Sequence, residues 1–187
     1  AFQNCDAISE IVIVTREDLI LPITRLTNGF DKVTAVVLGG SSRQESVSLG
    51  MNALSDKCEL AAIQDGARPL VTWQLIDRVV RAANHYHAAV PVIPVKDTIK
   101  VCNPGLVIST PDRSTLRAVQ TPQVFDFDLL RGALKYAFEN GKEITDDCSA
   151  VERLGMTVKT VEGDERNLKV TTPLDLKLAE MLMEENA

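Results

Sequence analysis

Short apolar runs alternate with segments of helical periodicity through the first half of the chain. The runs are typical of buried strands and cover residues 10–15, 32–38, 60–63 and 88–95. The segments with helical spacing of apolar residues cover positions 16–27, 43–53 and 72–85. Strands that alternate with helices predict a doubly wound α/β sheet, and near-continuous apolar strands fit a sheet that is covered on both faces.

The alternation breaks after residue 95. Residues 97–101 and 106–110 alternate polar with apolar side chains and flank Asn103-Pro104-Gly105, which predicts a half-exposed β-hairpin. A hairpin that projects from an α/β core has an apolar face to cover. We expect a partner subunit to cover it, so that residues 95–116 form an arm; the alternative is a hairpin that folds back on its own domain.

The rest of the chain returns to the sheet and adds helices. Residues 116–120 predict a strand, and Thr121-Pro122-Gln123 predicts a turn that leaves the sheet. The later predicted elements are helices at 126–140, 145–154 and from 172 onward, a strand at 156–161 and an extended segment at 167–171. The last helix has a strong start, because Thr172 can cap it, Pro173 suits its first position and Asp175 lies in its first turn.

Composition limits the classes of protein and of partner. A chain of 187 residues with 45% hydrophobic and 25% charged residues fits one globular domain, residues 1–187. The net charge of −6 argues against nucleic acid or an anionic membrane surface as a partner. Four cysteines at positions 5, 58, 102 and 148 are widely separated, as is typical of reduced thiols, and predict a cytoplasmic protein.

The strand at residues 60–63 ends in a group of residues that can bind charge. Ligands of open α/β sheets bind just beyond the carboxyl ends of the strands. Asp65 at that position can hold a hard cation through oxygen, and Arg68 can face a phosphate with its planar fork. The alternative is a surface Asp–Arg pair that closes a turn.

Four further residues are candidates for phosphate or nucleotide binding. Gly39 and Gly40 lie between a strand and a helix, where glycines let a ligand approach the backbone. Arg113 follows the hairpin, and Lys169 interrupts an apolar extended segment, so each can bring a positive charge to a phosphate. The alternatives are an ordinary tight turn and two solvent-exposed basic side chains.

Taken together and in order, several motifs resemble the 2-C-methyl-D-erythritol 4-phosphate cytidylyltransferase family. The resemblance runs from about Glu10 to the C-terminal helix. The motifs are Gly39-Gly40, Arg43-Gln44, Ser46-Val47, Asp65-Gly66-Ala67-Arg68-Pro69, Asp97-Thr98-Ile99-Lys100, Asp112-Arg113, Gln120-Thr121-Pro122-Gln123-Val124-Phe125, Ile144-Thr145-Asp146-Asp147 and Asn167-Leu168-Lys169-Val170-Thr171-Thr172-Pro173.

The resemblance implies a fold, a reaction and an assembly. The fold would be a three-layer α/β/α sandwich of the nucleotide-diphospho-sugar transferase type, with a mostly parallel sheet and a β-arm that interlocks two subunits into a homodimer. The reaction would join CTP to 2-C-methyl-D-erythritol 4-phosphate and release pyrophosphate, in isoprenoid precursor biosynthesis. It would need a divalent cation, usually Mg²⁺.

The resemblance also implies the role of each site residue. Those that would meet the cytosine are Gly39, Gly40 and Ser46. Asp65 would serve the metal and the substrates, with Gly66 and Arg68 beside it. Those around the methylerythritol phosphate would be Thr121, Thr145 and Lys169, and those reaching across from the partner's arm would be Thr98 and Arg113.

The sequence departs from the family in two respects, of which the smaller is that Gly66 stands where the family often has alanine and Ser41 where it often has an acid. The larger concerns its N-terminal part. The family has a glycine-rich phosphate loop before its first helix, and the sequence contains nothing like it. We therefore expect that a βα unit of roughly 30 residues or more is absent, and that this polypeptide alone is inactive. There are two alternatives to the methylerythritol phosphate reaction. A cytidylyltransferase for ribitol 5-phosphate would share similar core motifs, and a chain that lacks the phosphate loop could be a non-catalytic nucleotide-binding α/β dimer.

Overall fold

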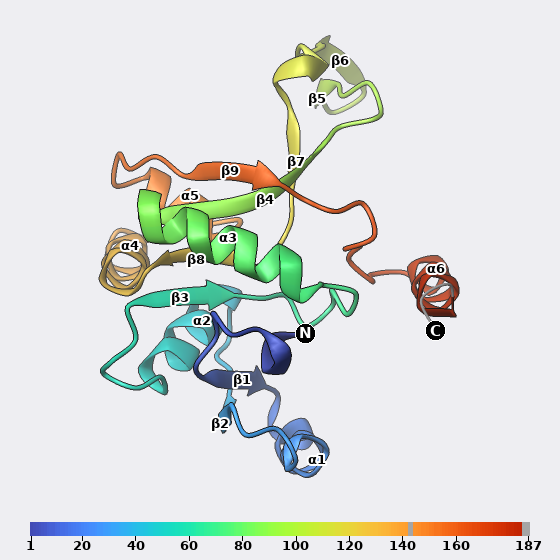
Figure 1. The fold of residues 1–187 in the computed structure, drawn as a ribbon. Helices are drawn as coiled ribbons and strands as arrows, with labels where there is room; N and C mark the ends of the chain where they lie inside the picture. The colour runs from blue at the N-terminus through green and yellow to red at the C-terminus, as the bar shows by residue number, and fades with distance from the viewer. Residues whose placement is uncertain (142–143, 185–187) are drawn as a thin grey trace.

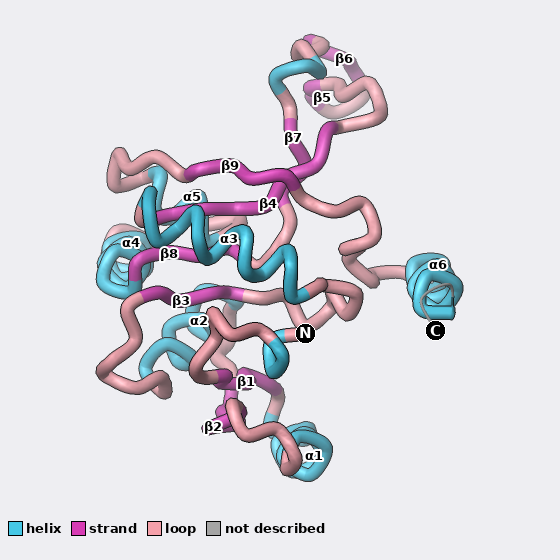
Figure 2. Tube along the Cα trace, in the orientation of Figure 1, coloured by secondary structure: helices cyan, strands magenta, loops and turns pink. Residues whose placement is uncertain are grey.

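The computed structural model describes residues 1–141 and 144–184 and has the predicted alternation of strands and helices (Figures 1 and 2). The strands are β1 (Ile11–Thr15), β2 (Val33–Leu38), β3 (Leu60–Ile63), β4 (Ala88–Pro94), β5 (Val101–Asn103), β6 (Leu106–Ser109), β7 (Arg117–Val119), β8 (Gln123–Asp126) and β9 (Lys159–Glu162). The helices are α1 (Glu17–Thr27), α2 (Arg43–Asn52), α3 (Trp73–Tyr86), α4 (Phe127–Glu139), α5 (Asp147–Glu152) and α6 (Pro173–Glu184). Short 3₁₀ turns cover Phe2–Asn4 and Arg113–Thr115.

The strands form two hydrogen-bonded sheets beside the separate hairpin. Strands β1 and β2 pair in parallel, and the larger sheet has the order β3-β8-β4-β7, with β9 also paired to β4. Strands β3, β4 and β9 run in one direction, whereas β8 and β7 run in the opposite direction, because each pairs antiparallel with its neighbours. The mostly parallel direction predicted for the sheet therefore holds for these three strands and for the β1–β2 pair, and β8 is a reversed strand inserted between β3 and β4.

Strand β8 corrects one sequence-based prediction. The segment that begins at Gln123 was expected to turn out of the sheet, but residues 123–126 pair with β3 on one side and with β4 on the other. This strand has only four residues, and its apolar part is limited to Val124 and Phe125. Both side chains are fully buried, on opposite faces of the sheet, so burial by tertiary packing, and not local pattern, makes this segment a strand.

Helices cover both faces of the larger sheet. Alternate residues of β4 belong to different apolar clusters: Ala88 and Val90 pack with α4 and α5, whereas Ala89 packs with Leu75 and Val79 of α3. Because successive side chains of a strand point to opposite faces, α3 forms one outer layer, and α4 and α5 form the other. The three-layer arrangement is confirmed.

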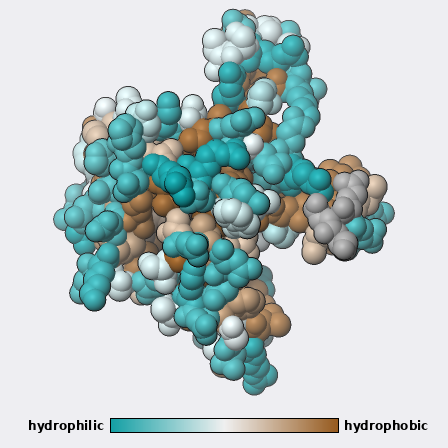
Figure 3. All heavy atoms as spheres, viewed as in Figure 1, coloured by the Kyte–Doolittle hydropathy of each residue, from teal (hydrophilic) through white to brown (hydrophobic). Residues whose placement is uncertain are grey.

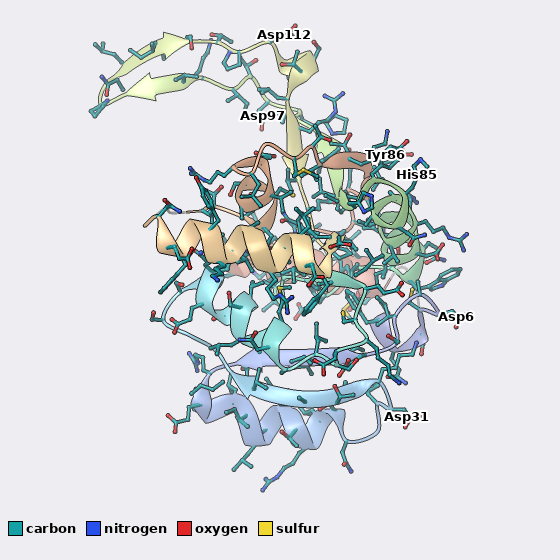
Figure 4. All side chains as sticks on the ribbon, turned by 90° about the vertical axis from the view of Figure 1, so that its left-hand side faces the viewer. Asp6, Asp31, His85, Tyr86, Asp97 and Asp112 are labelled. Carbon is teal, nitrogen blue, oxygen red and sulfur yellow. The ribbon has the colours of Figure 1, made fainter. Side chains whose placement is uncertain are left out.

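The predicted hairpin stands away from the body of the molecule (Figures 1 and 4). It turns at Gly105, whose φ of 82° is a conformation that favours glycine, and its strands β5 and β6 are shorter than the alternating runs suggested. Every residue of both strands is exposed, so the alternative of a hairpin packed back on its own domain is wrong for this structure.

Two helices have little cover. Helix α1 has no buried residue, and Ala179 is the one described residue of α6 that is buried. Apolar atoms reach the surface over both of these helices (Figure 3). None of the described helices combines the length and the apolar character needed to cross a membrane.

Candidate active site

A polar pocket of about 180 Å³ lies where β3 ends and β8 begins. It brings together five residues that the sequence had suggested: Asp65, Arg68, Thr121, Thr145 and Lys169. Its other lining residues are Arg43, Val119, Gln120, Gln123 and Asp146. Segments that are far apart in the sequence thus meet at one edge of the sheet.

Asp65 is at the centre of the charge arrangement in this pocket. Its Oδ2 lies 2.9 Å from Lys169 Nζ and 3.6 Å from Arg68 Nε. Its backbone N–H donates to Thr121 Oγ1 at 3.1 Å, and that hydroxyl donates to Gln64 Oε1 at 2.9 Å. The carboxylate is therefore held between two cations, on a backbone that is fixed by the first residues leading into β8.

Arg68 is tied to the backbone. Its Nη1 donates to the carbonyl oxygen of Asn167 at 2.7 Å, and its Nη2 donates to that of Val119 at 3.4 Å. Burial lowers the pKa of its guanidinium, and the nearby Asp65 carboxylate opposes part of that shift. The planar fork that was predicted to face a phosphate is engaged here with carbonyl oxygens, so its role toward a substrate stays a prediction.

Arg43 is a site residue that the sequence analysis did not select. It is the first residue of α2, and it donates to both carboxylate oxygens of Asp147, at 3.0 and 2.6 Å. Burial raises the pKa of the Asp147 carboxyl, and the two hydrogen bonds from Arg43 offset part of this rise. For Arg43 itself, burial lowers the pKa, but the bonds and the charge of Asp147 outweigh burial and raise it. The pair joins α2 to α5 beside the pocket, which Arg43 lines.

Gln123 is a second residue that was missed. Its Oε1 accepts from the backbone N–H groups of Asp147 and Cys148, both at 3.1 Å, and its Nε2 donates to Asp146 Oδ2 at 2.9 Å. Asp146 in turn caps α5 in a capping box with Ser149. The strand β8 thus holds the start of α5, next to Thr145. Both Arg43 and Gln123 stand within the motifs that carried the family resemblance, which was the available signal.

The predicted nucleotide-side residues lie together at the start of α2. The Gly40 N–H donates to Ser46 Oγ at 3.0 Å. A Cβ on Gly40 would lie 2.2 Å from Glu45 Cγ, and the Glu45 carboxylate accepts from the Ser41 N–H at 2.7 Å. The close approach that Gly40 permits is thus made here by the chain's own Glu45. These residues do not line the Asp65 pocket, but Arg43 of the same helix does.

Thr98, Arg113 and Gly66 are not brought into the pocket. Thr98 and Arg113 are exposed on the arm segment, where Arg113 Nη1 donates to the carbonyl oxygen of Lys96 at 2.6 Å. Asp97 and Asp112, their neighbours in sequence, lie on the same projecting segment, above the body of the molecule (Figure 4). Gly66 follows Asp65, and a Cβ there would meet nothing within 4 Å. One copy of the chain therefore does not unite all of the predicted residues.

A larger hollow, of about 370 Å³, is less suitable for a nucleotide. It includes Leu60, the first residue of β3, and therefore lies at the opposite end of this strand from Asp65. Its lining includes the carboxylate side chains of Glu59, Asp126 and Asp128. Three carboxylates would repel phosphate groups, whereas the Asp65 pocket sets three cations, Arg43, Arg68 and Lys169, against the two carboxylates of Asp65 and Asp146. We therefore take the Asp65 pocket as the candidate active site.

Comparisons with known proteins agree with this fold. A sequence model of the 2-C-methyl-D-erythritol 4-phosphate cytidylyltransferase family matches residues 1–185. A protein of that name from Symbiobacterium thermophilum is 45% identical over an alignment 188 positions long, which covers 100% of this chain and 78% of the relative. One from Caldanaerobacter subterraneus is 44% identical over an alignment 187 positions long, which covers 98% of this chain and 82% of the relative.

Solved structures show the same relationship. The crystal structure of 4-diphosphocytidyl-2C-methyl-D-erythritol synthase from Anaerococcus prevotii aligns with a TM-score of 0.90 at 29% identity, over 97% of this chain and 81% of that chain. The crystal structure of 2-C-methyl-D-erythritol 4-phosphate cytidylyltransferase from Thermus thermophilus aligns with a TM-score of 0.82 at 37% identity, over 94% of this chain and 82% of that chain. This chain therefore belongs to the 2-C-methyl-D-erythritol 4-phosphate cytidylyltransferase family.

Proposed function

We propose that the Asp65 pocket is where this chain carries out the reaction of its family, the transfer of the cytidylyl group of CTP to 2-C-methyl-D-erythritol 4-phosphate. The product is 4-diphosphocytidyl-2-C-methyl-D-erythritol, an intermediate of isoprenoid precursor biosynthesis. The observation that carries the proposal is the charge arrangement of the pocket. Lys169 Nζ lies 2.9 Å from Asp65 Oδ2, and Arg43 and Arg68 line the same space.

The chemistry needs charge neutralisation more than proton transfer. A phosphate oxygen of the methylerythritol phosphate attacks the α-phosphorus of CTP, and the bond from that phosphorus to the bridging β-phosphate oxygen breaks, so that pyrophosphate leaves with the electron pair. The attacking oxygen is already ionised at neutral pH, so no general base is required. Both reactants are anions, and catalysis therefore consists mainly of positioning them and of neutralising their charge. Lys169 supplies a point charge, and Arg43, whose planar fork is paired with Asp147, adds its positive charge to the pocket.

A bound Mg²⁺ ion fits this pocket if substrate phosphates supply most of its ligands. The part of the chain that the structure describes contains no group of three or more His, Cys, Asp or Glu side chains arranged to hold a metal. Magnesium usually binds through one or two carboxylates together with phosphates and water. Asp65 can offer Oδ1, since Lys169 and Arg68 both approach its Oδ2. The ion would neutralise and orient the phosphates.

The remaining residues complete the proposal. Thr121 and Thr145 line the pocket and would contact the methylerythritol phosphate. Gly39, Gly40 and Ser46, at the start of α2, would contact the cytosine once Glu45 moves aside, and Gly66 leaves open space beside Asp65.

The arm would complete the site in a homodimer. Leu106, Val107 and Ile108 expose apolar side chains on the hairpin, which a second copy of the chain can cover. Thr98 and Arg113 lie on the arm segment and would then reach the partner's pocket.

Substitution of Asp65 tests the assignment of the pocket. We expect Asp65→Asn to lower kcat with CTP, methylerythritol phosphate and Mg²⁺ by about 100-fold or more, because it removes the metal-binding charge, with little change in Tm. Asp128→Asn is a matched control, since Asp128 is exposed and pairs with Arg131 on α4, outside the pocket. Turnover of Asp65→Asn within threefold of the unmodified protein would contradict the proposal.

The sugar phosphate is tested by competition. The full-length protein, supplied with CTP and equal concentrations of methylerythritol phosphate and ribitol 5-phosphate, is expected to consume the first at a much higher rate. Preference for ribitol 5-phosphate would replace the proposed acceptor with the alternative one.

The arm is tested through the state of association. We expect Ile108→Asp to shift the protein from dimer to monomer in sedimentation velocity and to lower turnover, because it puts a charge into an apolar contact. Leu26→Asp, on the exposed face of α1, is the control and should change neither quantity. Full activity in a protein that sediments as a monomer would refute the role of the arm.

A further inference from the structure

We propose that Gln120 and Asn167 are positioning residues that hold Lys169 against Asp65. This inference rests on the function proposed above, in which Lys169 neutralises phosphate charge. It concerns two buried polar residues whose side chains the reaction itself does not use. Gln120 is 3% exposed and Asn167 is 1% exposed.

Lys169 lies in a segment without regular secondary structure. Residues 163–172 connect β9 to α6 and are neither helix nor strand. A lysine side chain has about 2 kcal/mol of rotamer entropy, so a mobile backbone would leave its ammonium group poorly placed. The contact of 2.9 Å with Asp65 therefore requires that other groups fix this segment.

The side chain of Gln120 hydrogen-bonds to the backbone of the first part of the segment. Its Oε1 accepts from the Asp164 N–H at 3.1 Å, and its Nε2 donates to the Asp164 carbonyl oxygen at 2.7 Å. The side-chain amide thus pairs with both backbone groups of one residue, as a neighbouring strand would. Gln120 is itself anchored to β4, because its N–H donates to the carbonyl oxygen of Pro91 at 2.9 Å. Gly163 permits this contact, since a Cβ there would lie 2.6 Å from Gln120 Oε1.

Asn167 fixes the part that leads into Lys169. Its Nδ2 donates to the carbonyl oxygen of Thr121 at 2.9 Å, and its own carbonyl oxygen accepts from Arg68 Nη1 at 2.7 Å. One residue beyond Lys169, the Val170 N–H donates to the carbonyl oxygen of Ala67 at 2.8 Å. The backbone on both sides of Lys169 is therefore docked on the loop that carries Asp65.

The two residues are expected to act on catalysis chiefly through Lys169. Loss of either amide would leave buried backbone groups without partners and would loosen the segment. Displacement of a charged group by about 1 Å can cost up to about 100-fold in rate. We expect Gln120→Ala and Asn167→Ala each to lower kcat about 10-fold, with a much smaller change in the KM for CTP.

A double-mutant cycle in the full-length protein separates positioning from a general structural effect. Lys169→Ala alone is expected to lower kcat/KM by about 100-fold or more. In the Lys169→Ala background, Gln120→Ala should change kcat/KM less than twofold, because the group that it positions is gone. Gln44→Ala is the control: Gln44 Nε2 donates to the carbonyl oxygen of Leu134, a bond of the same kind outside this segment, and its loss should leave kcat unchanged.

The outcomes are distinct. If Gln120→Ala still lowers kcat/KM by about 10-fold in the Lys169→Ala background, the positioning role is refuted and the substitution acts on the fold. If Lys169→Ala by itself leaves turnover unchanged, the role proposed for Lys169 fails first. Thermal unfolding of each variant shows whether it is folded.

Discussion

The β1–α1–β2 unit and the sheet around β4 follow the same pattern of strands and helices, but they bury their side chains to different depths. No residue from position 11 to position 38 is fully buried. In contrast, the first five residues of β4 are all buried, and Leu75, Ile76 and Val79 of α3 are at most 1% exposed. The apolar pattern in a sequence thus indicates which face of an element is turned inward, and it does not indicate how much protein covers that face.

Helix α2 connects the two regions. A Cβ on Gly50 would lie 2.7 Å from Val14 Cγ2 of β1, whereas the adjacent Met51 belongs to the core that contains Ala61 of β3. The proposed site draws on both regions, because Gly39 and Gly40 follow β2 of the less buried β1–α1–β2 unit, and Asp65 follows β3 of the larger sheet. Regions with few buried contacts open more readily, so the two sides of the site are expected to differ in local stability.

The largest expected effect comes from a substitution in the core of the larger sheet. Phe125 is fully buried in β8, and Phe125→Ala should lower the free energy of unfolding by about 3–5 kcal/mol. Leu26 on α1 is 78% exposed, and Leu26→Ala should change the free energy of unfolding by less than about 0.5 kcal/mol. Urea denaturation of both variants measures the difference. Similar losses in the free energy of unfolding for the two variants would mean that Leu26 on α1 is buried in solution.

Hydrogen exchange sharpens the comparison without a mutation. The amides of β1 and β2 should exchange at least about 10-fold faster than those of β4, which corresponds to about 1.4 kcal/mol in opening free energy. Mass spectrometry of peptides that cover residues 11–15 and 88–94 would measure this ratio. Equal protection in the two strands would remove the distinction.

The smallest expected effect concerns Glu10, which hydrogen-bonds to β2 of the β1–α1–β2 unit. Glu10 Oε1 accepts from Thr34 Oγ1 at 2.7 Å, and its Oε2 accepts from the Ser55 N–H at 3.0 Å. The bond from the Ser55 backbone, followed by that from Thr34, lowers the pKa of the Glu10 carboxyl below its usual value of 4.5. A lowered folded-state pKa gives stability that is present above the unfolded value and is lost as the pH falls through the folded value.

We therefore expect exchange in β1 and β2 to accelerate slightly more than exchange in β4 does as the pH falls below 4.5. Glu10→Gln, which keeps an acceptor but does not titrate, should flatten this pH dependence. An unchanged profile in that variant would show that Glu10 does not hold the region.

The sequence was informative where structure depends on local pattern. The strand–helix alternation, the hairpin at Gly105 and the acidic residue after β3 all follow from runs of neighbouring residues. Strand β8 was missed because four residues are too few for a periodic signal. The pair of Arg43 and Asp147 joins residues that are 104 positions apart, so periodicity and spacing could not reveal it. The hydrogen bonds from the Gln120 side chain to Asp164 could likewise not be predicted from local sequence, because they join distant segments.

The reversed direction of β8 also limits how the pocket can change in evolution or design. Ile63 pairs with Gln123, so the last residue of one strand faces the first residue of the other, and Asp65 and Thr121 extend from that pair. Sliding one strand by a single residue would move these groups about 3.4 Å and turn every side chain of the strand to the other face. The spacing between the carboxylate and the hydroxyl can therefore be reset only in whole-residue steps, and gradual widening of the substrate space must come from side-chain replacement.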